Sequence, residues 1–162
     1  MNNNLPKQER LRNKFLIKNL FDYGEKINKS GFICFWHLYN YNGTSNKFGS
    51  NSKNINSENI LCKDVDINAD LDKTVDNKVK VMVSVSKKHH KLAVNRNKIK
   101  RLLKESYRLN KNLIHKFVNK NEQLLICFIY TKKDIPLYSK TNEVMIEFLN
   151  DIAKKLKKNN NE

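Results

Sequence analysis

Residues 95 to 110 predict a helix with two chemically opposite faces, and this helix constrains the fold more than any other stretch. At 3.6 residues per turn, successive side chains are about 100° apart around the axis. Polar and basic residues then gather within one arc: Asn97, Lys100, Arg101, Lys104, Arg108 and Lys111. The opposite side holds Ile99, Leu102, Leu103, Ser106, Leu109, Leu113 and Ile114. One face is therefore predicted to pack on a core and the other to meet negative charge.

The charge of the chain points to a polyanionic partner. The 162 residues include 32 Lys and Arg against 16 Asp and Glu, a net charge of +16. A composition biased toward Asn, Lys and Ile could raise the Lys count without any ligand. The position of the arginines favours a partner over a composition bias. Only five Arg occur, and three of them, Arg96, Arg101 and Arg108, lie in the two-faced helix. The planar guanidinium fits phosphate in a way that Lys does not, so we expect a nucleic-acid partner.

The length suits one domain, residues 1–162. Within it, the stretch from Asn40 to Asn77 departs from the rest, because it is rich in Asn, Ser and Asp and carries four Lys against six acidic residues. A stretch of this length without a regular pattern is unusual inside a domain. We predict a disordered insertion at residues 40–77, between two strands.

Hydrophobic patterns predict the other elements. The first helix should begin after Asn13, a candidate N-cap, and end at Gly24, which is placed to close it in the left-handed conformation. Three strands and a last helix follow at residues 32–39, 79–85, 124–130 and 142–158. The second strand alternates Val with other residues, as for one buried face, and the third is apolar throughout, as for a strand covered on both faces. The order predicts an α/β sandwich, with helices packed on a small sheet.

A basic loop precedes the two-faced helix. It contains Lys87, Lys88 and Lys91, and Asn95 is a candidate N-cap for the helix that follows. The positive end of the helix dipole and its unpaired N–H groups favour an anion there, and Arg96 lies in the same turn. We predict an anion-binding site that combines the loop, the start of the helix and the basic arc.

Few residues could form a protein-based active site. His89 and His90 adjoin each other without metal-ligand spacing, so both phosphate binding and acid–base catalysis stay open for them. Glu105 is the only acid in the helix and is expected to orient Arg101 and Arg108. Three isolated cysteines indicate neither a disulfide framework nor a zinc site. No apolar run reaches membrane-spanning length, so we expect a cytoplasmic protein without a membrane partner.

The two-faced helix and the strand before it closely resemble the bacterial ribonuclease P protein subunit. The family pattern is a strand ending in Ser-Val-x-Lys-Lys/Arg, a short loop, and then Ala-Val-x-Arg-Asn-x-x-Lys-Arg-x-x-Arg-Glu-x-x-Arg. The matching residues here are Ser84, Val85, Lys87, Lys88, Ala93, Val94, Arg96, Asn97, Lys100, Arg101, Lys104, Glu105 and Arg108. The front of the chain is similar as well, at Pro6, Lys7, Arg10, Leu11, Phe21 and Gly24.

The resemblance implies a protein that performs no chemistry itself. In this family a catalytic RNA removes the 5′ leader from precursor tRNA with bound Mg²⁺, and the protein assists substrate recognition and metal affinity. The expected partners are therefore that catalytic RNA and precursor tRNA, with no obligate protein partner and no organic cofactor. Because the chemistry is expected in the RNA, no catalytic residue and no protein metal ligand is expected in this chain.

The resemblance also assigns residues to two surfaces. The catalytic RNA would be bound by Lys87, Lys88, Lys91, Arg96, Asn97, Lys100, Arg101, Lys104 and Arg108. A cleft between the first helix and the sheet would hold the single-stranded leader at Ile17, Phe21 and Phe35. Ile17 stands where many relatives have Phe, so hydrophobic contact is expected there in place of stacking. Lys104 replaces a usual Arg, which keeps the charge and loses the planar fork.

For the fold, the resemblance implies a two-layer α+β sandwich similar to domain 2 of ribosomal protein S5. The expected order is α-β-β-(β)-α-β-α with a left-handed strand-helix-strand crossover, an exception to the right-handed rule. A general RNA-binding or ribosomal-type assembly protein, with no role in tRNA processing, is the alternative that the basic helix also supports. A nuclease that uses His89 or His90 as a base is a third.

Overall fold

The computed structural model describes residues 5–40 and 78–160. The predicted insertion at 40–77 lies outside the described residues, except for Asn40. The elements are, in order, η1 (Lys7–Glu9), α1 (Lys14–Tyr23), β1 (Glu25–Lys29), β2 (Phe32–Asn40), β3 (Val79–Val85), α3 (Ala93–Asn110), α4 (Asn112–His115), β4 (Glu122–Tyr130) and α5 (Tyr138–Asn160). Among the described helices, none has the length and apolar character that a membrane span requires.

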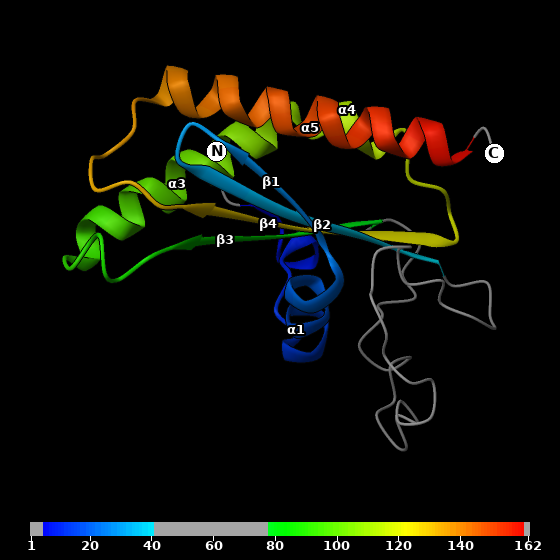
Figure 1. Cartoon of the computed structure of the whole chain (residues 1–162), viewed down its shortest axis with the longest axis horizontal. Coiled ribbons are helices and arrows are strands. Elements are labelled where there is room, and N and C mark those ends of the chain that lie inside the picture. Colours follow the sequence, from blue (N-terminus) through cyan, green and yellow to red (C-terminus); the bar gives the residue numbers. More distant parts are fainter. Residues whose placement is uncertain (1–4, 41–77, 161–162) are drawn as a thin grey trace.

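The four strands form one sheet in the order β1-β2-β4-β3. β1 and β2 pair antiparallel, as do β2 and β4, whereas β3 and β4 are parallel. α3 connects these two parallel neighbours, which confirms the predicted strand-helix-strand crossover, and the hand of this crossover stays a prediction. α3, α4 and α5 cover one face of the sheet and α1 lies against the opposite face (Figure 1). The mixed α/β architecture is therefore as predicted.

The central strand β4 contributes to two cores, because strand side chains alternate between the faces of a sheet. Leu124, Ile126 and Phe128 pack under α3 and α5, whereas Leu125 and Cys127 pack under α1. Every β4 residue except Ile129 is buried, as predicted for a strand covered on both sides. The core under α1 is the smaller one, built on the buried residues Leu11, Leu16, Leu20, Leu125 and Cys127. α1 is therefore anchored by far fewer side chains than α3 and α5.

Both ends of α1 are set by single residues. The Asn13 Oδ1 accepts hydrogen bonds from the backbone N–H groups of Phe15 (2.8 Å) and Leu16 (3.3 Å), which confirms Asn13 as the N-cap. The predicted left-handed conformation of Gly24 is wrong, since its φ is −72° and its backbone is extended. Glycine is required there by close packing: a Cβ would lie 2.2 Å from the carbonyl oxygen of Leu20. The chain can therefore turn directly from α1 into the sheet.

The hairpin formed by β1 and β2 brings a strand that hydrophobic patterning did not predict. The β1 sequence, EKINK, alternates weakly and its residues are exposed or half-buried, because β1 is an edge strand. Ser30 and Gly31 form the turn, both with positive φ (49° and 84°). β1 fits the optional strand in the expected element order, although it lies earlier in the chain than that order placed it.

α3 confirms the two-faced helix with two corrections. It begins at Ala93 after Leu92, so Asn95 is not its N-cap, and no side chain caps it. Its buried residues are Ile99, Leu103, Ser106 and Tyr107. Leu109, predicted to be buried, is 53% exposed. The buried side of α3 includes Tyr107, whose ring centroid lies 6.3 Å from that of Phe128 in β4, and Leu109 lies outside this side.

Candidate nucleic-acid interface

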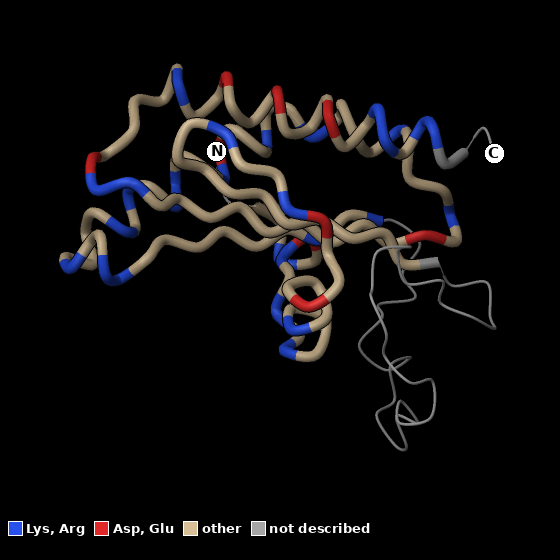
Figure 2. Tube along the Cα trace, viewed as in Figure 1, with Lys and Arg blue, Asp and Glu red and all other residues tan. Residues whose placement is uncertain are grey.

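The predicted basic face of α3 is present and open to solvent. Asn97 and Arg101 are exposed, and Lys100, Lys104 and Arg108 are half-buried. Figure 2 shows Lys and Arg along α3 and around the loop that leads into it. Among the described residues, neither Lys100, Arg101 nor Lys104 forms an ion pair with an acidic side chain. These three cations are therefore free to meet an external anion.

The cations of this face are close enough to affect one another. Burial lowers the pKa of Lys104, and the neighbouring positive charges of Arg10 and Lys100 lower it further. Arg10 comes from the N-terminal segment, more than ninety residues away in sequence. The segment thus adds a cation to the basic face of α3, and a bound anion would relieve the repulsion among the three charges.

Arg108 is held in place by Glu105. Its Nε and Nη2 donate to the two carboxylate oxygens over 2.9 and 2.7 Å, a planar two-point contact. Hydrogen bonding to Arg108 lowers the pKa of Glu105, so the carboxylate stays charged. The prediction that Glu105 orients Arg108 is confirmed. Arg101, the other predicted partner, forms no ion pair with it.

Arg96 has a structural role in the loop before α3. Its Nη1 donates to the carbonyl oxygens of His90 (2.8 Å) and Lys91 (2.6 Å), and so fixes the loop to the first turn of the helix. His90 is 3% exposed, and its Nε2 lies 2.8 Å from the carbonyl oxygen of Lys132. A buried ring with a backbone partner does not suit a catalytic base. The sequence did not indicate either of these contacts.

The loop that Arg96 fixes presents cations to solvent. Lys87, Lys88 and Lys91 are exposed, and no described acidic side chain forms an ion pair with them. Leu92 and Val94 beside them are 67% and 76% exposed. The structure therefore brings the predicted loop lysines to the start of α3, at the far left of Figure 1.

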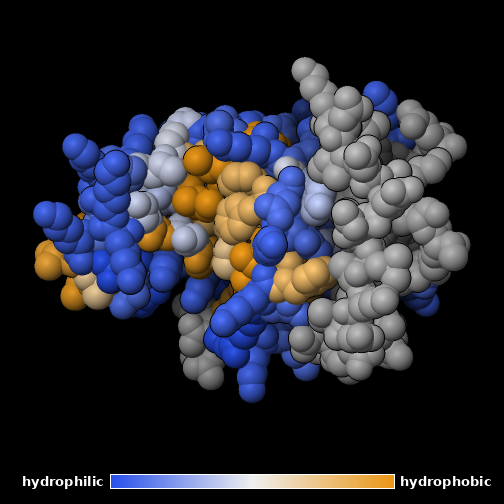
Figure 3. All heavy atoms as spheres, turned by 60° about the horizontal axis from the view of Figure 1, so that its bottom comes forward, coloured by the Kyte–Doolittle hydropathy of each residue, from blue (hydrophilic) through white to orange (hydrophobic). Residues whose placement is uncertain are grey.

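The predicted leader cleft lies on the other face of the sheet, beside α1. Ile17 of α1 and Phe35 of β2 are half-buried over the smaller core. Phe21 is 40% exposed, and its ring meets that of Phe35 edge to face at a centroid distance of 4.9 Å. The structure thus brings the three predicted residues together. In Figure 3 hydrophobic side chains run across the middle of this side of the molecule, between hydrophilic ones.

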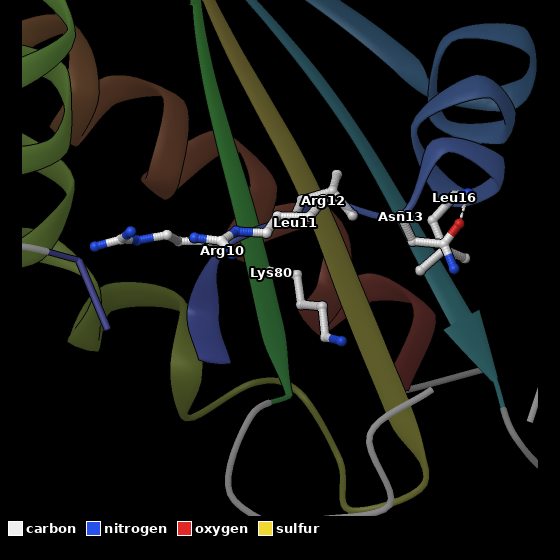
Figure 4. A pocket seen from close by; sticks show the side chains of 6 residues that line it. All are labelled: Arg10, Leu11, Arg12, Asn13, Leu16 and Lys80. Carbon is white, nitrogen blue, oxygen red and sulfur yellow. Dashed lines mark hydrogen bonds between the residues drawn. The ribbon is translucent and has the colours of Figure 1, made fainter. Parts of the chain in front are cut away.

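A cationic hollow adjoins this apolar surface and was not predicted. It has a volume of about 280 Å³ and is lined by Arg10, Leu11, Arg12, Asn13, Leu16 and Lys80 (Figure 4). Leu11 and Leu16 also belong to the smaller core, so the hollow continues the surface beside α1. Lys80 sits on the face of β3 that points toward α1, where it is 9% exposed. The alternation of strand 79–85 was the one signal that could have placed it there.

The N-terminal segment that supplies these cations is tied to both β3 and α3. The Leu11 N–H donates to the Val81 carbonyl oxygen over 3.0 Å. Glu9, which is 6% exposed, pairs with Lys111 at the end of α3, with Nζ and Oε1 2.6 Å apart. Lys111 was predicted to be part of the basic arc, and the structure uses it in this pair. The segment therefore links the apolar surface to the basic helix.

The described residues offer no cluster of metal ligands. Within residues 5–40 and 78–160, no group of three His, Cys, Asp or Glu side chains is placed to hold a metal ion. Burial raises the pKa of the Cys127 thiol to about 12, so this cysteine is a buried hydrophobic residue and an inert thiol. What this part of the chain offers is cationic and aromatic surface.

Comparison with known proteins gives one consistent family. A family model described as Ribonuclease P matches residues 5–157. Proteins named ribonuclease P protein component from two strains of Porphyromonas gingivalis are each 35% identical over 74 residues, which cover 45% of this chain. The alignment spans 54%, about half, of the length of these relatives.

Solved structures with a similar fold carry related names. The RNase P protein of Staphylococcus aureus superposes with a TM-score of 0.52 at 18% identity, over 90% of this chain and 95% of the other. The RNase P protein from Thermotoga maritima gives 0.52 at 19% identity, over 88% and 96%. At such identities these two structures support the α+β fold.

Proposed function

The chain belongs to the ribonuclease P family, and on that premise we propose that it is the protein component of a ribonuclease P, an endoribonuclease that removes the 5′ leader of precursor tRNA. The matched residues, 5–157, include both candidate surfaces. In this proposal the protein is a cytoplasmic RNA-binding subunit and its partners are a catalytic RNA and precursor tRNA. Hydrolysis is assigned to the RNA.

The basic face of α3 would bind the catalytic RNA. The observation that carries the proposal is the crowding of Arg10, Lys100 and Lys104 there: burial and the two neighbouring charges lower the pKa of Lys104, and no described acidic side chain pairs with it. RNA phosphates would provide the missing counter-charge. Arg101, exposed at the centre of this face, is free to make a two-point contact with a phosphate. Arg96 and Arg108 would act with part of their donors already engaged.

The surface beside α1 would bind the single-stranded leader. Phe21 and Phe35 offer ring surface on which a base can stack, and Ile17 adds hydrophobic contact. The adjoining hollow supplies Arg10, Arg12 and Lys80 for the leader phosphates. Single-stranded RNA is bound by this combination of a cationic track and exposed rings, with little preference for sequence. The proposal therefore predicts that leaders of different sequence bind alike.

Mg²⁺ would be held mainly by the catalytic RNA. The described side chains do not gather as a set of metal ligands, so we assign no step of the reaction to a protein-bound ion. The protein would instead lower the Mg²⁺ concentration that the holoenzyme needs, because its cations neutralise phosphates that would otherwise repel one another.

One assay tests the proposal. Precursor-tRNA cleavage is measured at low Mg²⁺ with the catalytic RNA alone, the protein alone, and both together. We expect no cleavage by the protein alone, and much faster cleavage by the two together than by the catalytic RNA alone. Cleavage by the protein alone would overturn the role of cofactor. A protein that binds the RNA without raising cleavage would favour the alternative, a general RNA-binding or ribosomal-type assembly protein.

A further inference from the structure

A second basic groove lies between α4 and α5, on the side of the sheet opposite α1. Its volume is about 240 Å³, and its lining is Leu113, Lys116, Phe117, Asn150, Ala153, Lys154 and Lys157. Three of these residues are cations and none is acidic. Leu113, Phe117 and Ala153 add apolar surface, and Asn150 adds an amide. The groove thus combines positive charge with apolar surface, away from the surfaces described above.

Two of the cations converge on one ring. The Nζ atoms of Lys116 and Lys157 lie 5.2 and 4.8 Å from the centroid of Phe117. The ring holds both ammonium groups by cation–π attraction, although their charges repel each other. Lys154 lies one turn before Lys157 on α5 and adds a third like charge. An anion in the groove would remove this repulsion.

The charges around the groove are segregated from those on the rest of α5. Figure 2 shows acidic residues along the first part of α5 and basic residues toward its end. Lys155, which is next to Lys154, pairs with Glu25, whereas no described acidic side chain pairs with Lys116, Lys154 or Lys157. The helix dipole accounts for cations in the last turns of α5. Lys116 is the C-cap of α4, so a second helix end brings its cation to the same groove.

We propose that this groove binds the phosphodiester backbone of RNA, as a second RNA site distinct from α3. The three cations are all lysines, which act as point charges and do not form the fork that reads a guanine edge. Both ammonium groups lie over Phe117, so this ring is not free to stack on a base. The groove therefore fits phosphates, without preference for sequence. This second site rests on the proposed function only for the identity of the RNA, which would be the catalytic RNA or precursor tRNA.

The position of the groove defines what such a site would do. The basic loop and the start of α3 lie at one end of the helical layer, and the groove lies toward the other end (Figure 1). An RNA bound at both places would be contacted along the length of that layer. Each phosphate contact releases counterions, so the two sites contribute separately to the salt dependence of binding.

The test compares two double variants that remove the same charge from the same helix. Lys154→Gln with Lys157→Gln alters the groove. Lys155→Gln with Lys158→Gln is the matched control, because Lys155 and Lys158 do not line the groove. Full-length proteins, checked for equal unfolding by circular dichroism, are titrated with the catalytic RNA, and the assembled holoenzymes with precursor tRNA. Two RNAs are used because either one could supply the phosphates.

We expect the groove variant to bind one of the two RNAs about tenfold more weakly at low salt, with a salt slope smaller by about 1.4–1.8, which is two phosphate contacts. The control should bind both RNAs as the native protein does. Native binding of both RNAs by the groove variant, or an equal loss in the control, overturns the second site. Arg101→Gln, a variant of α3, is measured alongside to separate the proposed RNA binding by α3 from the second site in the groove. If Arg101→Gln weakens RNA binding and the groove variant does not, the second site is wrong and the proposed function stands.

Discussion

Replacing Lys111 with Met should lower the free energy of unfolding by about 2–3 kcal/mol. The Lys111 Nζ donates to Glu9 Oε1 over 2.6 Å, and Glu9 is 6% exposed. Met keeps most of the length of the side chain and removes the charge, so the carboxylate would stay buried without its cation. Breaking a buried ion pair costs about 3–5 kcal/mol, against about 0–1 kcal/mol for an exposed one. The Lys111 side chain is 28% exposed, so water can partly replace it, and the cost falls below the full range.

Removing the charge of the other partner, Glu9, is expected to lower the free energy of unfolding by less. Glu9→Gln leaves a partly exposed lysine that can turn to water, so about 1 kcal/mol should be lost. Both variants are compared with the native protein by urea unfolding followed by circular dichroism. Lys140→Met is the matched control, because Lys140 pairs with Glu143 over 2.9 Å on an exposed part of α5, and its unfolding midpoint should not move. A Lys111→Met variant as stable as this control would refute the reasoning.

Three further predictions concern binding and pH. Arg101→Gln should reduce the salt slope of catalytic-RNA binding by about 0.9, because one phosphate contact is lost; an unchanged slope would show that Arg101 only faces solvent. Phe35→Ala should weaken binding of leader-bearing precursor tRNA by about 1–3 kcal/mol in a titration of the holoenzyme, and should leave tRNA without a leader unaffected. Burial lowers the pKa of His37 and of His115, so protonation disfavours the folded state and stability should fall as the pH drops below about 6.5. Urea midpoints measured above and below that pH should differ less in His115→Gln, and an equal pH dependence would show that His115 does not contribute.

The hydrophobic pattern of the sequence predicted those helices and strands in which buried residues recur at regular spacing or form a continuous run. The two-faced helix was predicted because its apolar residues recur at helical spacing, and β4 because its residues 124–130 form an apolar run. β1 was missed because an edge strand buries too little to leave a pattern. Leu109 was misplaced because the predicted apolar face left out Tyr107, which is buried, and so was drawn too far toward the side of Leu109. Gly24 was misread because its constraint is a close approach to Leu20, which only the folded chain creates.

The sequence predicted which residues share a candidate surface, but it did not predict the contacts that those residues make. The family resemblance placed Ile17, Phe21 and Phe35 together, and the structure does bring them to one surface. The cationic hollow was not predicted, because Arg10 and Lys80 are seventy residues apart in the chain and meet only through the fold. The contacts that hold Arg96 depend in the same way on the position of the loop. Tertiary structure therefore decides which cations are free and which are engaged.

The most direct test of the account is whether the protein acts on the leader. The affinity of the catalytic RNA for precursor tRNA and for tRNA without a leader is measured with and without the protein. The surface beside α1, with its rings and adjoining cations, is assigned to the leader alone, so it adds nothing to the binding of a tRNA that lacks one. We predict that the protein strengthens binding of the leader-bearing substrate and leaves binding of the leaderless tRNA unchanged. Equal strengthening of both would contradict the account.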